Sequence, residues 1–191
     1  MTTTLPQSIG RVALGTALLL LIPLVAMQFS REVNWTGFDF LVASGLLFGA
    51  GLAFTLLARL GNSAPYRLGM AVAVGAGLLL VWANLAVGLV GSENNPANLL
   101  YGAVLVVAFG GAVAARFRPL GMSRAMFAAA LTYVVVTLLA LFVWPPAVAH
   151  AEPSANLPNV LVANGVFAAL WAVAGWLFQR AGTAGPRQAN S

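Results

Sequence analysis

The chain has 191 residues, of which 61% are hydrophobic and 7% charged. Soluble domains carry about a quarter charged residues, so this composition excludes a polar-surfaced globular protein and predicts an integral membrane protein. Cysteine and lysine are absent, which excludes disulfides, thiolate metal sites, thiol catalysis and Schiff-base chemistry. The net charge of +5 comes from arginines scattered at segment ends, a pattern that indicates membrane topology rather than nucleic-acid binding.

The first apolar run, 12–29, follows Arg11 directly. A basic flank before an apolar stretch also occurs in signal peptides. This run, however, is close to the roughly 20 residues that cross a bilayer, and no Ala-x-Ala cleavage site follows it. We therefore expect an uncleaved transmembrane helix.

Five further apolar segments follow along the chain. Together they predict an all-α integral membrane protein, a bundle of six transmembrane helices forming one domain over residues 1–180. The expected helices are 12–29, 39–58, 68–90, 98–115, 125–144 and 158–178. The small, polar tail 181–191 is predicted to be disordered and cytoplasmic.

Acidic residues and arginines lie in different connections, and these connections alternate along the chain. The acidic residues all lie in or beside the first, third and fifth connections: Glu32, Asp39, Glu93 and Glu152. The arginines other than Arg31 lie at the termini and in or beside the second and fourth connections: Arg11, Arg59, Arg67, Arg116, Arg118, Arg124, Arg180 and Arg187. Because arginine-rich short loops stay in the cytoplasm, we expect both termini to be cytoplasmic.

Uncharged polar residues lie in the outer third of several predicted helices. They are Ser44, Asn84, Tyr101, Thr137 and Asn164. Spacing to Gly91 and Leu157 predicts that Asn84 and Asn164 each lie roughly 10 Å below the outer boundary. An amide in hydrocarbon needs a hydrogen-bond partner, so these side chains should face the bundle interior. Two interpretations stay open: interhelical hydrogen bonds that fix the packing, or the floor of a cavity, open to the outside, that holds a small polar ligand.

The connection 91–98 places Glu93 and three asparagines between two apolar runs. Glu93 and Asn95 offer oxygen atoms to a cation, but the spacing matches no metal-binding loop. Pro96 beside asparagines is typical of a turn that caps the next helix. We expect the turn and cap, with a cation or solute entrance as the alternative, and we predict no metal or cofactor.

Small residues mark possible contact faces between helices. Gly45 and Gly49 form a GxxxG pair, a pattern that lets helices pack closely in lipid. Packing within the bundle is the first interpretation, and contact with a second copy or another membrane protein is the alternative.

The spacing of several residues also hints at an internal repeat, because Gly45, Arg59 and Arg67 recur at one constant spacing as Gly102, Arg116 and Arg124.

The stretch 87–99 (VGLVGSENNPANL), followed by 115–119 (ARFRP), resembles a family of uncharacterised bacterial inner-membrane proteins. The residues that carry the resemblance lie within the middle third of the chain. It implies a bacterial inner-membrane setting and brings no activity with it.

Three classes of function follow from these observations. An enzyme needs an acid–base pair, a nucleophile or a metal at a site, and the few ionisable groups lie in loops, so we expect no enzymatic activity. Binding or transport of a small solute is weakly favoured and predicts that Asn84 and Asn164 face a common cavity. The alternative is a structural or assembly subunit of a larger membrane complex.

Overall fold

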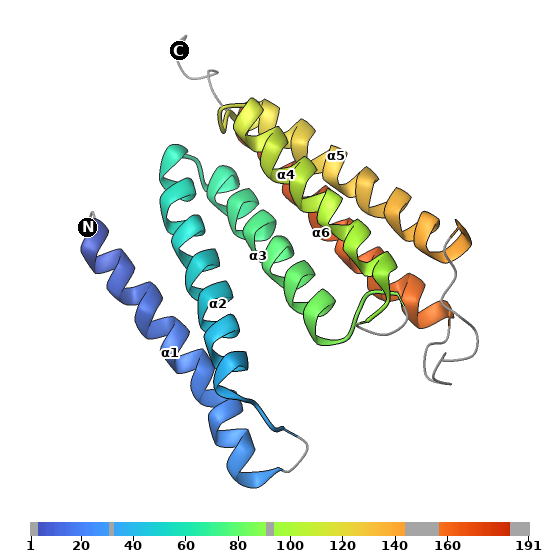
Figure 1. The fold of residues 1–191 in the computed structure, drawn as a ribbon. Coiled ribbons are helices and arrows are strands. Elements are labelled where there is room, and N and C mark those ends of the chain that lie inside the picture. Colours follow the sequence, from blue (N-terminus) through green and yellow to red (C-terminus); the bar gives the residue numbers. More distant parts are fainter. Residues whose placement is uncertain (1–3, 31–32, 91–93, 144–156, 184–191) are drawn as a thin grey trace. The chain divides into compact units, whose positions relative to one another are not determined.

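The computed structural model describes residues 4–30, 33–90, 94–143 and 157–183, and these residues contain helices and no strand (Figure 1). Six helical segments are long and apolar enough to cross a membrane. The prediction of an all-α, six-helix membrane protein is therefore confirmed. The chain is a multi-pass membrane protein.

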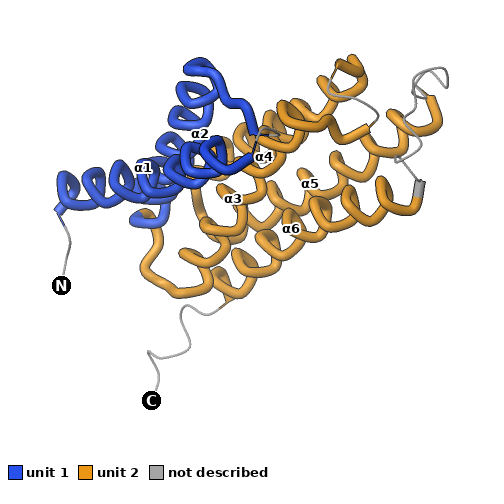
Figure 2. Tube along the Cα trace, turned by 90° about the horizontal axis from the view of Figure 1, so that it is seen from below, with its two compact units in different colours: residues 1–59 blue, residues 60–191 orange. Residues whose placement is uncertain are grey.

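The chain divides into two compact units, residues 1–59 and residues 60–191 (Figure 2). The first unit is a helical hairpin of α1 (Leu5–Phe29) and α2 (Gly37–Leu57). Gly51 lets the two helices approach, because a Cβ at this glycine would lie 2.6 Å from a methyl group of Val12. Arg59 donates a 2.7 Å hydrogen bond to the hydroxyl of Ser8 and so ties the end of the hairpin to the start of α1.

The second unit contains four membrane-length segments. They are α3 (Ala64–Ala86), the 3₁₀ helix η2 (Pro96–Tyr101) continuing into α4 (Gly102–Ala114), α5 (Pro119–Leu138) continuing into the π-helix η3 (Leu139–Val143), and α6 (Leu157–Thr183). Helix α3 packs on α6, α6 on α5, and α5 on α4. Small residues allow the last contact, since a Cβ on Gly111 would lie 2.7 Å from that of Ala125.

Several helices begin earlier in the chain than the apolar pattern predicts, and α1 does so by the most, at Leu5 rather than at residue 12. Helix α3 starts at Ala64 because the Ser63 hydroxyl caps it, accepting from the Tyr66 amide at 3.4 Å, and a proline occupies its first turn. Helix α5 starts at Pro119, whose fixed φ suits a first helical position. The apolar pattern misses both starts because Arg67 and Arg124 interrupt it. Tyr66 and Met122 in these first turns are buried, so burial as well as the proline and cap positions favours the helix there.

The ends of other helices also differ from the prediction. Helix α3 ends at Ala86 rather than at residue 90, and Gly88 follows in a left-handed conformation with φ of 74°. Helix α6 continues to Thr183, so the first three residues of the predicted tail are helical. The rest of that tail, 184–191, lies outside the described residues. The predicted internal repeat pairs the turn before α3 with the turn between α4 and α5. These turns differ in backbone conformation: the first contains the 3₁₀ helix η1 (Ala58–Leu60), and the second has two residues with positive φ. The internal repeat stays a prediction.

Candidate functional site

The side-chain amide of Asn164 is the centre of a hydrogen-bond network at one end of the second unit. Asn164 is 3% exposed. Its Oδ1 accepts hydrogen bonds from the hydroxyls of Tyr101 at 2.8 Å and Tyr133 at 3.0 Å. Its Nδ2 donates to the backbone carbonyls of Leu89 at 3.2 Å and Val160 at 2.8 Å. One side chain therefore joins α6 to η2, to α5 and to the segment after α3.

The polar atoms of this network satisfy one another. An amide oxygen has two lone pairs, and the two tyrosine hydroxyls fill both. The Thr137 hydroxyl lies 3.1 Å from that of Tyr101 and donates to the backbone carbonyl of Tyr133 at 2.9 Å. Tyr101 and Tyr133 are themselves fully buried, with ring centroids 5.0 Å apart. The network supports the packing interpretation of Tyr101, Thr137 and Asn164, because Asn164 keeps no donor or acceptor for a ligand.

A second asparagine, Asn98, organises the turn that follows α3. Its Oδ1 accepts from the backbone amides of Leu89 at 2.9 Å and Val90 at 3.1 Å. The carbonyl of Leu89 in turn receives Nδ2 of Asn164. Gly88, with its positive φ, lets the chain reverse toward these partners. Asn98 is 3% exposed, and the 3₁₀ helix η2 holds it in place.

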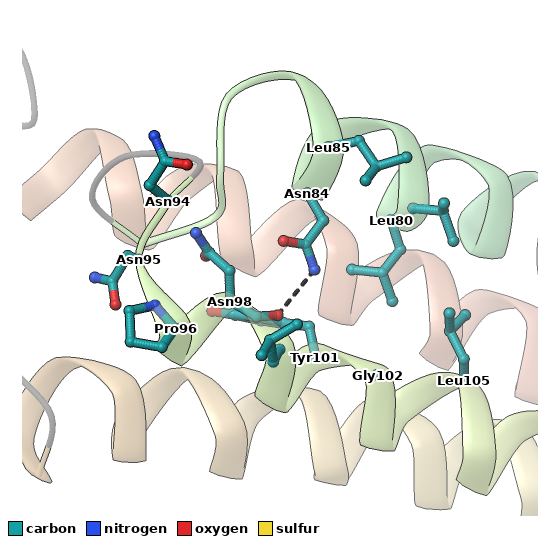
Figure 3. A pocket seen from close by; sticks show the side chains of 12 residues that line it. Leu80, Asn84, Leu85, Asn94, Asn95, Pro96, Asn98, Tyr101, Gly102 and Leu105 are labelled. Carbon is teal, nitrogen blue, oxygen red and sulfur yellow. Dashed lines mark hydrogen bonds between the residues drawn. The ribbon is translucent and has the colours of Figure 1, made fainter. Parts of the chain in front are cut away.

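A groove of about 400 Å³ lies between α3 and the η2–α4 segment (Figure 3). Its apolar walls come from Leu80, Val81, Leu85, Leu99 and Leu105. Its polar lining comes from Asn84, Asn94, Asn95, Asn98 and Tyr101, and Pro96 and Gly102 complete the lining. Figure 3 shows the asparagines gathered at one end and Leu80, Leu85 and Leu105 extending away from them. The groove is therefore amphipathic along its length.

Asn84 is the half-buried polar residue on the α3 side of this groove. Its Nδ2 donates to the backbone carbonyl of Asn98 at 2.9 Å, as Figure 3 shows. Its Oδ1 accepts no hydrogen bond from any residue that the structure describes. Leaving an amide oxygen in an apolar setting without a hydrogen bond costs about 1–3 kcal/mol, so a donor that reaches it is stabilising. Oδ1 of Asn84 thus offers an acceptor to a ligand or to water in the groove.

The structure places Asn84 and Asn164 in different surroundings. Helix α3 ends at Ala86, so Asn84 lies in its last turn, nearer to the helix end than the predicted end at residue 90 implied. Asn164 is in the third turn of α6, buried, and is not among the residues that line the groove. The two asparagines are linked through Leu89 and Asn98 and do not share this groove.

The other predicted site residues are distributed between the two units. Ser44 is in the first unit, where its hydroxyl donates to the backbone carbonyl of Phe40 at 2.6 Å. Asn95 caps η2, its Oδ1 accepting from the amide of Ala97 at 3.0 Å, in line with the predicted turn and cap. Glu93 lies outside the described residues. No group of three or more histidine, aspartate or glutamate side chains gathers in the described ranges in a way that could hold a metal ion.

Two important residues, Asn98 and Tyr133, were not predicted as site residues. Asn98 was predicted at the start of the fourth helix, next to a turn and cap, and its bond to backbone amides depends on the left-handed turn at Gly88. Tyr133 did carry a usable signal. It precedes Thr137 by four positions, and residues so spaced share one face of a helix.

Comparisons of this chain with protein-family models, with curated proteins and with solved structures found no match.

Proposed function

We propose that this protein is a non-enzymatic membrane protein that binds a small amphipathic molecule in the groove between α3 and α4. The observation that carries the proposal is the groove's lining, with leucine side chains along its length and asparagines at one end. A volume of about 400 Å³ falls within the range of small-molecule sites in proteins. The ligand would place its alkyl chain along the leucines and its polar head beside Asn84.

The chemistry of Asn84 restricts which polar headgroup the ligand can carry. Its Oδ1 can only accept a hydrogen bond, so the head should carry a donor such as a hydroxyl group. Binding is a better supported proposal than transport. Asn164, the most deeply placed amide, is occupied by two tyrosine hydroxyls and two carbonyls and so offers no site to a passing solute.

The test uses the full chain in nanodiscs of phosphatidylcholine, whose headgroup carries no hydrogen-bond donor. Two probes share one acyl chain: glycerol mono-oleate, which has two hydroxyls, and methyl oleate, which has none. A ligand that binds only the folded state raises its stability by about 2.7 kcal/mol at 100 times its dissociation constant. We expect the mono-oleate to raise the melting temperature more than the methyl ester does, and Asn84→Leu to remove the difference.

A groove-filling variant separates this site from general lipid effects. Gly102 lines the groove and has no heavy atom within 4 Å of the position that a Cβ would occupy, so Gly102→Leu should block both probes. Gly110 on the same helix has equally open space but does not line the groove, and Gly110→Leu is the matched control. Equal stabilisation of all variants by both probes would contradict the proposal.

An assembly role is the second candidate, and the exposed face of α2 supports it. Gly45 and Gly49 have no heavy atom within 4 Å of where a Cβ would lie. In lipid, a pair of small residues at this spacing favours close contact with another helix. A second membrane protein or a second copy of this chain would meet α2 there.

This second candidate predicts a change in assembly and not in ligand binding. Gly45→Leu with Gly49→Leu should shift the particle mass in mild detergent toward the monomer, or remove a co-purifying partner. Gly15→Leu on α1, which also enters open space, is the control. An unchanged mass and unchanged partners would contradict the assembly role.

For the location, we propose a bacterial inner membrane with both termini in the cytoplasm. The separation of arginines from acidic residues supports this orientation. In this orientation the asparagine end of the groove lies on the periplasmic side of the membrane.

A further inference from the structure

The second unit carries five exposed arginines at the end opposite to the asparagines. They are Arg67 on α3, Arg116 and Arg118 in the α4–α5 turn, Arg124 on α5 and Arg180 on α6. We call this set the arginine end. Among the described residues, the helix ends that form it contain no aspartate or glutamate side chain, since the four acidic residues of the chain are Glu32, Asp39, Glu93 and Glu152.

Contacts between the helix ends place these arginines at one end of the second unit. The Tyr66 hydroxyl donates to the carbonyl of Phe117 at 3.1 Å, which joins the start of α3 to the α4–α5 turn. The rings of Tyr66 and Phe178 meet with centroids 5.3 Å apart, which places the last turns of α6 at the same end. A Cβ on Gly182 would lie 2.6 Å from a methyl group of Leu120, which joins α6 to the start of α5.

The α4–α5 turn holds its arginines in an unusual backbone conformation. Arg116 and Phe117 have φ of 51° and 56°, in the left-handed region that favours glycine. The amide of Phe117 donates to the carbonyl of Ala112 at 3.0 Å, and that of Arg116 to the carbonyl of Val113 at 2.9 Å. These bonds form a Schellman motif, in which the left-handed position is usually glycine. An exposed arginine occupies it here.

Arg180 stacks on an exposed tryptophan of the same helix. Its guanidinium carbon lies 3.9 Å from the ring centre of Trp176, which is 45% exposed. Tryptophan prefers the level of the lipid headgroups. This pair is therefore typical of a helix end at headgroup level, where lipid phosphates lie.

We propose that the arginine end binds the phosphate of an anionic phospholipid, with Arg67, Arg116 and Arg118 as its main contacts. Guanidinium groups bind phosphate oxygens through paired hydrogen bonds. Charge complementarity identifies the partner, since the described helix ends that form the arginine end contain no carboxylate and the pair of Arg180 and Trp176 is typical of headgroup level. This site is separate from the groove and does not depend on the function proposed above.

Native mass spectrometry of the full chain tests the proposal. The probes are phosphatidylglycerol and phosphatidylcholine with identical acyl chains. The experiment uses a Gly102→Leu background, whose leucine fills the groove, so that a lipid in the groove is not counted. Each basic side chain near an anionic lipid surface contributes roughly 1 kcal/mol. Arg116→Gln with Arg118→Gln should therefore weaken phosphatidylglycerol retention about 30-fold and leave phosphatidylcholine retention unchanged.

Charge-matched variants decide whether the position of the arginines matters. Arg11→Gln with Arg31→Gln removes the same charge from residues 1–59, outside the segments that form the arginine end, and should change retention less than about three-fold. Lysines at positions 116 and 118 should restore part of the retention, which also shows that the fold survives. Equal losses in the two glutamine pairs, or no loss in either, would overturn the proposal. Full displacement of the lipid by millimolar inorganic phosphate would overturn it too, because the site would then serve a soluble anion.

Discussion

Replacing Asn164 by leucine should cost the second unit a large part of its stability. Leucine fills a similar volume but makes no hydrogen bonds. The Tyr133 hydroxyl and the carbonyl of Leu89 would then lose the partners that they have in the buried network. Tyr101 can still turn its hydroxyl toward Thr137, 3.1 Å away.

The expected loss follows from these two unpartnered groups. A buried polar group without a partner costs about 1–3 kcal/mol, and interhelical hydrogen bonds in lipid measure about 0.6 kcal/mol on average and up to about 1.7. For two groups the first range gives about 2–6 kcal/mol and the second about 1–3 kcal/mol, and their overlap gives an expected loss of about 2–3 kcal/mol. Asn84→Leu, which removes one bond from a half-buried residue, should cost less than about 1 kcal/mol.

Reversible unfolding in mixed micelles, titrated with a denaturing detergent and followed by circular dichroism, measures these values. A double-mutant cycle with Tyr133→Phe sharpens the test. Removing that hydroxyl in the Asn164→Leu background should recover about 1–2 kcal/mol, because an unpartnered donor disappears. A loss below about 0.5 kcal/mol for Asn164→Leu, or no coupling to Tyr133, would refute the role given to this network.

Three further predictions concern packing, backbone strain and topology. Gly111→Ala should lower the melting temperature, because the new methyl would lie 2.7 Å from the Cβ of Ala125. Gly110→Ala enters open space and should be neutral or slightly stabilising. Equal effects of the two variants would contradict the α4–α5 contact. Arg116→Gly should raise stability by about 1 kcal/mol in neutral detergent by relieving the left-handed strain, and the same variant should weaken phosphatidylglycerol retention; a destabilised variant would contradict the strain. An alkaline phosphatase fusion at Asn94 should be active and one at the C-terminus inactive, and the reverse result would overturn the proposed orientation.

Much of the fold could be predicted because the information is local in the chain. A run of about 20 apolar residues predicts a membrane-spanning helix whatever its neighbours do, and all six such helices are present. The need of Asn164 for a partner was also predictable, since a buried amide without one is costly in lipid. The helix starts at Ala64 and Pro119 were harder to predict from the apolar pattern, although Ser63 and Pro119 are residue types that favour the start of a helix.

The partners of the polar residues were decided by the tertiary structure. Asn164 bonds to a carbonyl 75 positions away and to hydroxyls 31 and 63 positions away. Such pairs depend on the rotation of each helix and on the packing order α3, α6, α5, α4, which no local pattern records. The same order leaves a groove between α3 and α4, and the turn at Gly88 turns Asn98 toward the amides of Leu89 and Val90. The sequence by itself determined that the chain crosses a membrane and that its buried polar groups need partners, because transfer into lipid is a property of each segment. Only the packing of the helices decided that the amide of Asn164 has all its hydrogen bonds and that the amide of Asn84 faces a groove.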